Sequence, residues 1–192
     1  IGLEAKISGT LPDNLRAELS GTLQTDISKA FSGAIQGKVA WSEGTLTVQD
    51  AVLTAPGLDL KMEARLVPGG EMKMTVPSAA FTGEGLRVLL ALAPLPGYTL
   101  AAQESGALSL SNLVLGEEKG GEWKVLSGNM DVKGVDLAQT DGSGKITNIS
   151  GSVQTADNAL HIKELKSEGI RVAGDIRPDL AHKKIALELN GD

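Results

Sequence analysis

The two histidines, His161 and His182, are the residues of this chain best suited to proton transfer or metal binding. Either role needs a partner within reach, such as a serine nucleophile, a pair of carboxylates or a second metal ligand. The spacing of the sequence joins neither histidine to such a partner. We therefore predict that both are surface residues, His161 on the polar face of a strand and His182 in a turn.

The segment from Asp141 to Lys145 is the nearest approach to a phosphate-binding loop. That motif begins with a glycine, and its lysine is followed by Ser or Thr. Gln139 occupies the position of the first glycine here, and Ile146 follows the lysine. A hairpin turn through Asp141-Gly142-Ser143-Gly144 is the better interpretation.

The composition argues against several other kinds of site. Without cysteine there is no thiol nucleophile and no thiolate metal ligand. The acidic residues stand singly, without the spacing of a calcium loop. The net charge is −6 and the Lys and Arg residues are not clustered, which argues against a nucleic-acid partner. A glycosylation sequon at Asn148-Ile149-Ser150 is short enough to arise by chance. We predict no catalytic residue, no metal, no cofactor and no enzyme activity.

Alternation of apolar and polar residues is the strongest signal in the chain. Between Leu58 and Leu66, every second residue is apolar and the residues between them are charged. This period of two marks a strand with one buried face. Similar short segments follow one another between turns such as Pro56-Gly57 and Pro68-Gly69-Gly70, and the spacing leaves no room for crossover helices. The sequence therefore predicts an all-β fold built as an antiparallel strand meander.

One stretch of the pattern occurs twice. The segment Gly37–Val48 matches Gly151–Ile162 after 114 residues, and Gly57–Leu60 matches Gly169–Val172 after a slip of two residues. Self-similarity at fixed spacing indicates a repeated supersecondary unit. We predict two related β-repeats of five or six strands each, over residues 1–84 and 106–192, with a short helix and a linking loop at 85–105.

The segment from Gly85 to Ala93 is the one helical candidate. Leu86, Leu89 and Leu90 follow helical spacing, and Pro94 ends the pattern. Such a helix either plugs one end of the sheet or dips into a membrane. Its polar side lacks the Lys and Arg of a membrane-lying helix, which favours the plug. The longest apolar run, Val88–Leu95, is also far shorter than the ~20 residues that span a bilayer.

The apolar side of so many strands must be covered, because leaving it in water costs about 25 cal/mol per Å². The sheet can close into a barrel, fold into a two-layer sandwich, or stay a trough that a ligand or partner fills. Its apolar residues are mostly aliphatic, which suits an acyl chain. A plain closed core would use the same residues, and the residues alone favour that closed core.

The second half of the chain carries a succession of short strand motifs after the Leu-rich helix. They are Ser105-Gly106-Ala107-Leu108-Ser109-Leu110, Ile146-Thr147-Asn148-Ile149-Ser150-Gly151-Ser152-Val153, Leu160-His161-Ile162-Lys163-Glu164-Leu165 and Val172-Ala173-Gly174-Asp175-Ile176. In this order they resemble the repeating unit of AsmA-like envelope proteins of Gram-negative bacteria. The resemblance is clearest from about Gly85 to Gly191.

This resemblance implies a long twisted β-sheet curled into a groove, in the periplasm, within a parent protein anchored in the inner membrane. It also implies that the groove shields or conducts phospholipid acyl chains between the inner and outer membranes, without catalysis. The groove would be lined by Leu46, Val48, Leu58, Leu60, Met62, Leu160, Ile162, Ile170 and Val172.

We adopt this lipid-carrying envelope module as the working hypothesis. The alternative is a structural or protein-interaction module, either a β-sandwich or a repeat, with a closed core and no lipid. Its strand edges would then contact other proteins or further copies of the chain.

Overall fold

A computed structural model gives the fold of residues 2–10, 14–24, 32–67, 72–92, 94–101, 106–117, 123–156, 159–179 and 184–191. The elements, in chain order, are β1 (Gly2–Thr10), β2 (Asn14–Gln24), β3 (Ser32–Ser42), β4 (Thr45–Ala55), β5 (Leu58–Leu66), β6 (Met72–Thr82), α1 (Gly83–Leu92), β7 (Tyr98–Leu100), β8 (Ala107–Glu117), β9 (Trp123–Gln139), β10 (Lys145–Ala156), β11 (Ala159–Ser167), β12 (Ile170–Asp179) and β13 (Lys184–Gly191). His182 lies outside the described residues.

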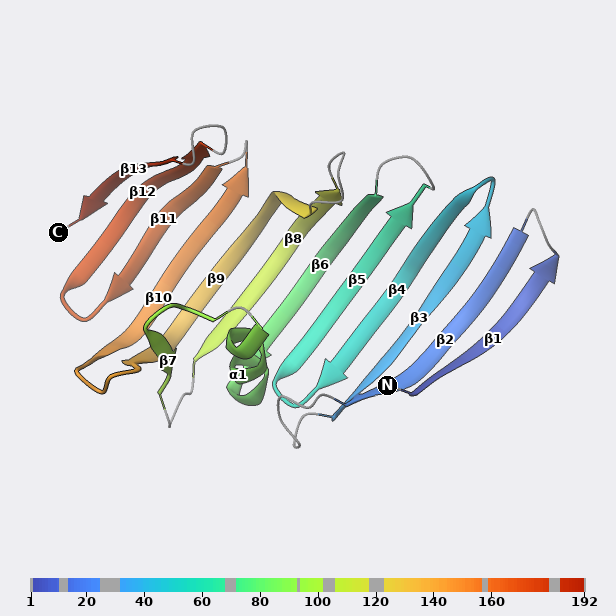
Figure 1. Cartoon of the computed structure of the whole chain (residues 1–192), viewed down its shortest axis with the longest axis horizontal. Helices are drawn as coiled ribbons and strands as arrows, with labels where there is room; N and C mark the ends of the chain where they lie inside the picture. Colours follow the sequence, from blue (N-terminus) through green and yellow to red (C-terminus); the bar gives the residue numbers. More distant parts are fainter. Residues whose placement is uncertain are drawn as a thin grey trace.

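All the strands belong to one antiparallel sheet (Figure 1). Its order follows the chain from β1 to β13, except that β6 pairs directly with β8 and the short β7 pairs only with β9. In the described part of the chain β1 pairs only with β2 and β13 only with β12, so the sheet is open at both edges. The predicted all-β meander, curled and with one short helix between its two repeats, is confirmed.

The pairing of neighbouring strands aligns their apolar residues with one another across the sheet. Residues that face each other in an antiparallel ladder project from the same face. On one face, eight successive strands place directly paired apolar residues in a line that we call the central row. Its members are Ile35, Leu53, Leu60, Ala79, Leu110, Met130, Val153 and Ile162.

Two further rows flank the central row on the same face. The far row is Val39, Val48, Ala64, Met74, Leu115 and Val125. The α1-side row is Ala55, Leu58, Phe81, Leu108, Val132, Gly151, Leu165 and Val172. The apolar sides of the two repeats are therefore one continuous surface.

The opposite face is mostly polar. The residues next in sequence to the central row pair with one another in the same way, and apart from Val52 they are all hydrophilic. They are Gln36, Val52, Lys61, Ser78, Ser111, Asn129, Gln154, His161 and Asp175. This clean division is what the period of two in the sequence predicts.

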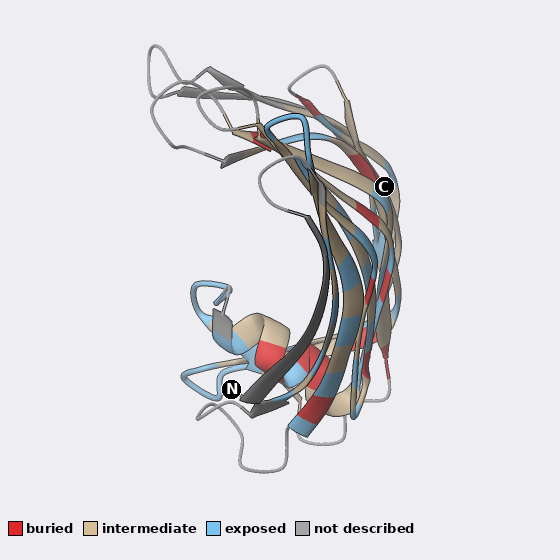
Figure 2. Ribbon diagram, turned by 90° about the vertical axis from the view of Figure 1, so that its right-hand side faces the viewer, coloured by how far each residue is buried: buried red, intermediate tan, exposed pale blue. Residues whose placement is uncertain are grey.

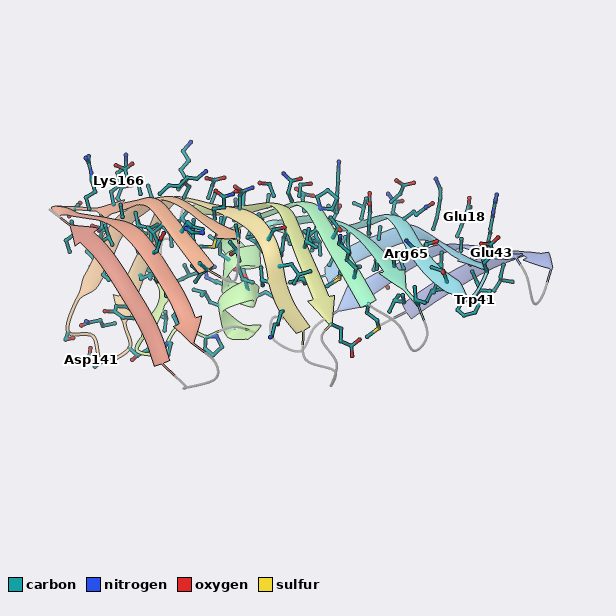
Figure 3. The ribbon with its side chains drawn as sticks, turned by 90° about the horizontal axis from the view of Figure 1, so that it is seen from above. Glu18, Trp41, Glu43, Arg65, Asp141 and Lys166 are labelled. Atoms are coloured by element: carbon teal, nitrogen blue, oxygen red, sulfur yellow. The ribbon has the colours of Figure 1, made fainter. Side chains whose placement is uncertain are left out.

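The apolar face is the inner, concave face of the curl. Figure 2 shows the sheet bent like an open arch with α1 on its concave side. The helix packs there because Val88 joins Leu58 in the buried cluster, next to Leu53, Leu60 and Phe81. In Figure 3 the side chains of Glu18 and Lys166 lie on the side of the sheet opposite the helix.

The helix lies close to its predicted place: it spans Gly83–Leu92 and so begins two residues before the predicted Gly85, while Ala93, the predicted last residue, lies outside the described residues. Leu86 is buried as expected, whereas Leu89 and Leu90 are only half-buried. Val88, outside the predicted apolar stripe, is buried instead because it meets Leu58 of β5. α1 thus covers the sheet near the turn between β4 and β5, as the plug interpretation predicts.

β9 corrects one prediction. The sequence predicts two strands here, one with Trp123 and Val125 and the next with Met130, Val132, Val135 and Leu137, but residues 123–139 form one strand. The alternation slips there because the ladder between β8 and β9 shifts register between Ser111 and Leu115. This irregularity includes the bulge expected near Asn112, whose φ is 52°.

The two repeats share their bulges as well as their strands. In the β4–β5 pair the register shifts between Val48 and Ala51, and in the β11–β12 pair it shifts between Ile162 and Leu165, which are the matching positions. The two-residue slip falls just after these bulges, where β4 is two residues longer than β11. The β-repeat is therefore preserved down to the position of its irregularities.

Candidate functional site

The concave face is the most extensive feature that could bind a ligand. The central row crosses eight strands, and neighbouring strands lie about 4.8 Å apart, so it runs for roughly 34 Å along the sheet. The hydrocarbon core of a bilayer is about 30 Å thick and consists of two leaflets, so the length of one extended acyl chain is about half that thickness. The row is long enough to hold an extended acyl chain.

The residues predicted to line a groove all lie on this face. Leu46, Val48, Leu60, Met62, Ile162 and Val172 are half-buried. Leu160 is 40% exposed and Ile170 is 59% exposed. Leu58 differs from the rest, since it is only 8% exposed and packs under Val88 of α1. Eight of the nine positions therefore keep apolar surface accessible, while the helix covers the ninth.

The face is aliphatic and uncharged along its rows. The members of the central row are Ile, Leu, Ala, Met and Val, and no carboxylate or ammonium group stands among them. A surface of this kind has no group that would orient or activate a polar substrate. It can gain free energy only by removing hydrocarbon from water, at about 0.8 kcal/mol per methylene group.

Register brings His161 opposite Asp175 on the convex face, a pairing that the sequence does not reveal. His161 Nδ1 lies 2.8 Å from Asp175 Oδ1, and both side chains are about one-third exposed. Regular pairing outward from the turn at Glu168-Gly169 would place His161 opposite Ile176. The bulge in β11 shifts the pairing by one residue, so His161 lies opposite Asp175 instead. On its other side His161 faces Gln154, so its cross-strand neighbours include no hydroxyl nucleophile.

The segment Asp141-Gly142-Ser143-Gly144 forms the β9–β10 turn, as predicted, and not a phosphate loop. The Ser143 hydroxyl, 2.6 Å from Asp141 Oδ1, and the Ser143 backbone N–H, 2.9 Å from the same atom, lower the pKa of the Asp141 carboxyl below its ordinary value of 3.8. The Ser143 hydroxyl also contacts the side chain of Gln139. These side chains hold the turn closed.

The sequon residues have a structural role that the sequence did not suggest. The backbone N–H of Gly134, which has a φ of 62°, donates to Ser150 Oγ at 2.9 Å. The backbone N–H of Asn148 donates to Asp136 Oδ1 at 2.7 Å. Both bonds satisfy backbone donors where the β9–β10 ladder is irregular, so these side chains stabilise a bulge.

The described residues lack two further kinds of functional feature. They contain no group of three His, Asp or Glu side chains placed to hold a metal ion. They also contain no helix with the length and hydrophobicity needed to cross a membrane.

Comparison with known proteins does not assign the chain to a family. The sequence matches no protein-family model, and comparisons with curated proteins and with solved structures gave no match either. The interpretation of the concave face therefore depends on its own chemistry.

Proposed function

We propose that this protein is a non-enzymatic module whose concave face shields or conducts the acyl chains of lipids. The observation that carries the proposal is the continuous apolar surface formed by the three paired rows, which α1 covers only where it contacts β5, β6 and β8. A contiguous apolar surface of this extent needs an occupant, because soluble proteins rarely leave one in water.

The shape of the surface favours hydrocarbon over a folded protein partner. Figure 2 looks along the length of the sheet and shows the strands bent into an arch, so the rows, which cross the strands, run along the inside of this arch. They present side chains from successive strands at even spacing, so an extended chain lying across the strands contacts every one of them. The polar part of a lipid would remain outside the curl. This division suits a molecule with one long apolar tail and a hydrophilic head.

The cellular setting follows from the resemblance to AsmA-like envelope proteins. On that basis the module acts in the periplasm, its parent protein is anchored in the inner membrane, and its cargo is phospholipid on its way between the inner and outer membranes. The aliphatic lining is consistent with this cargo and does not select a particular headgroup.

Lipid content is the direct test. Mass spectrometry of an organic extract of the purified protein should detect phospholipid, and delipidated protein should bind a fluorescent fatty acid saturably. We expect Leu160→Asp to weaken that binding about tenfold, since it places a charge on the exposed part of the concave face at a cost of at least ~1.4 kcal/mol.

Ser78→Asp is the matched control. Ser78 is exposed on the convex face opposite Lys61, so an added carboxylate there has a favourable neighbour and should leave binding unchanged. Absence of lipid from the extract together with no saturable fatty-acid binding would contradict the proposal. Equal loss in both variants would contradict the assignment of the concave face.

A second candidate function is edge-to-edge assembly. In the described part of the chain both edge strands carry unpaired ladder groups, which are templates for further pairing. The path from β1 to β13 contains twelve strands, so β13 of one copy and β1 of a translated copy run antiparallel and could continue the ladder. Sedimentation that depends on protein concentration, in lipid-free protein, would favour this function.

A further inference from the structure

The clearest unexplained surface lies at the turn between β11 and β12. The corresponding turn between β4 and β5 is covered by α1, because Gly85 lies against the backbone of Gly57 and Val88 packs on Leu58. The repeat therefore contains a site where a helix docks, and its first copy shows how the site is used.

The second copy keeps the sheet side of that docking site. Aligned on their turns, Leu53, Leu58 and Leu60 of the first hairpin correspond to three aliphatic residues of the second. These are Leu165, Ile170 and Val172, which with Gly169 we call the Ile170 surface. The side-chain type is retained at these three positions, although nothing in strand pairing requires a large apolar residue at a hairpin tip, whereas Ser167 takes the place of Ala55.

The two copies differ in what covers them. Leu58 is 8% exposed, whereas its counterpart Ile170 is 59% exposed. Figure 1 shows the reason, since α1 and β7 lie along the same rim of the sheet below β5 to β9 and end before the β11–β12 turn. Ile170 is the most exposed of the large apolar side chains in the described residues.

Glycine makes close docking possible at both turns. A Cβ on Gly85 of α1 would lie 1.9 Å from the Gly57 carbonyl oxygen, so the helix meets this turn backbone to backbone. Gly169 has the same left-handed conformation as Gly57, with φ values of 75° and 70°. The space beside Gly169 is open, because a Cβ added there would meet no atom within 4 Å.

The charge at the second turn also suits a helix. Glu168 is exposed and takes the place of Pro56, next to the glycine whose counterpart meets the first turn of α1. A carboxylate near a helix N-terminus is stabilising because it faces the positive end of the helix dipole. The second turn therefore offers a carboxylate at the position where the first turn has Pro56.

We propose that the Ile170 surface docks a short helix of a partner polypeptide, apolar on the side that meets the sheet and carrying a glycine in its first turn. The helix binds as α1 binds to the first repeat, with its N-terminal turn against Gly169 and an aliphatic side chain on Ile170. This role differs from lipid binding in its ligand, a polypeptide, although Ile170 and Val172 at this rim also belong to the predicted groove lining.

The test uses the full chain, delipidated, and a fluorescent peptide with the sequence of α1, residues 83–92. A side-chain lactam between positions 87 and 91 holds the peptide helical, and both positions are exposed in α1. Fluorescence anisotropy should show saturable binding. Ile170→Asp should weaken it at least tenfold, and Leu160→Asp, on the same face but at the other end of β11, should change it less than twofold.

A peptide variant tests the glycine contact without altering the protein. Leucine in place of the glycine at peptide position 85 should weaken binding at least tenfold, because its side chain cannot enter the backbone contact. No saturable binding of the unmodified peptide would overturn the proposal. Equal weakening by Ile170→Asp and Leu160→Asp would overturn it too, by showing that the peptide adheres to the whole concave face. Neither result bears on fatty-acid binding.

Discussion

The β4–β5 and β11–β12 hairpins are two copies of one pattern with different surroundings. Each has a bulge at the matching position and a turn that ends in a left-handed glycine, and each carries aliphatic residues on the concave side. Only the first lies under α1. The comparison shows that strand pairing alone builds the hairpin, whereas the helix determines which of its apolar residues become core.

The same comparison explains why the concave face remains accessible. α1 is ten residues long and contacts β5, β6, β7 and β8, so it covers only part of a sheet of thirteen strands. The helix therefore acts as a local plug and leaves most of the three apolar rows open to a ligand.

Substitution of the turn glycines should give the largest difference in stability between the two hairpins. A Cβ on Gly57 would lie 1.9 Å from the carbonyl oxygen of Thr82, whereas Gly169 faces open space. We expect Gly57→Ala to lower the free energy of unfolding by roughly 4 kcal/mol, from this backbone clash and a positive φ. Gly169→Ala has only the conformational penalty and should cost about 1 kcal/mol.

Urea denaturation followed by tryptophan fluorescence measures both changes. Because the two substitutions are chemically identical, each serves as the other's control. Similar losses for the two variants would show that the end of β6 and the first turn of α1 do not press on the Gly57 turn, and the helix-docking comparison would then fail.

Leu58 and Ile170 should give the next largest difference. Leu58→Ala removes buried methyl groups beneath Val88 and should lower the free energy of unfolding by about 3 kcal/mol. Ile170→Ala changes a side chain that is mostly in water and should change the free energy of unfolding by no more than about 0.5 kcal/mol. A loss above ~2 kcal/mol for Ile170→Ala in the same urea experiment would mean that something already covers the second hairpin.

The fold was largely predictable because its signals are local. Alternation gives each strand its two faces, and residues such as Pro56-Gly57 and Gly169 mark the turns within a few positions. The order of strands then follows from short connections, which leave neighbours in sequence as neighbours in the sheet. The helix was predictable in place, although its buried residue Val88 depends on a contact with β5 that helical spacing alone does not reveal.

Bulges account for most of what the sequence did not predict. One extra residue in a strand reverses the alternation after it, so the irregularity between β8 and β9 made one strand resemble two. A bulge also brings His161 opposite Asp175. The candidate site was predictable as a face, because all nine residues lie on it, but the burial of Leu58 and the exposure of Ile170 depend on where α1 docks.

The smallest expected effect concerns the carboxylates at the two matching bulges. Asp50 pairs with Lys38 at 3.1 Å, and its counterpart Glu164 pairs with Arg171 at 3.2 Å. These ion pairs are largely exposed, so Asp50→Asn and Glu164→Gln should each change the free energy of unfolding by less than about 0.5 kcal/mol. Asn also tolerates the φ of 51° at position 50, whereas the β-branched Asp50→Val should cost about 1 kcal/mol more. If Asp50→Asn proved as costly as Asp50→Val in urea denaturation, charge pairing and not backbone conformation would fix the first bulge, and the two repeats would differ on their convex faces as well.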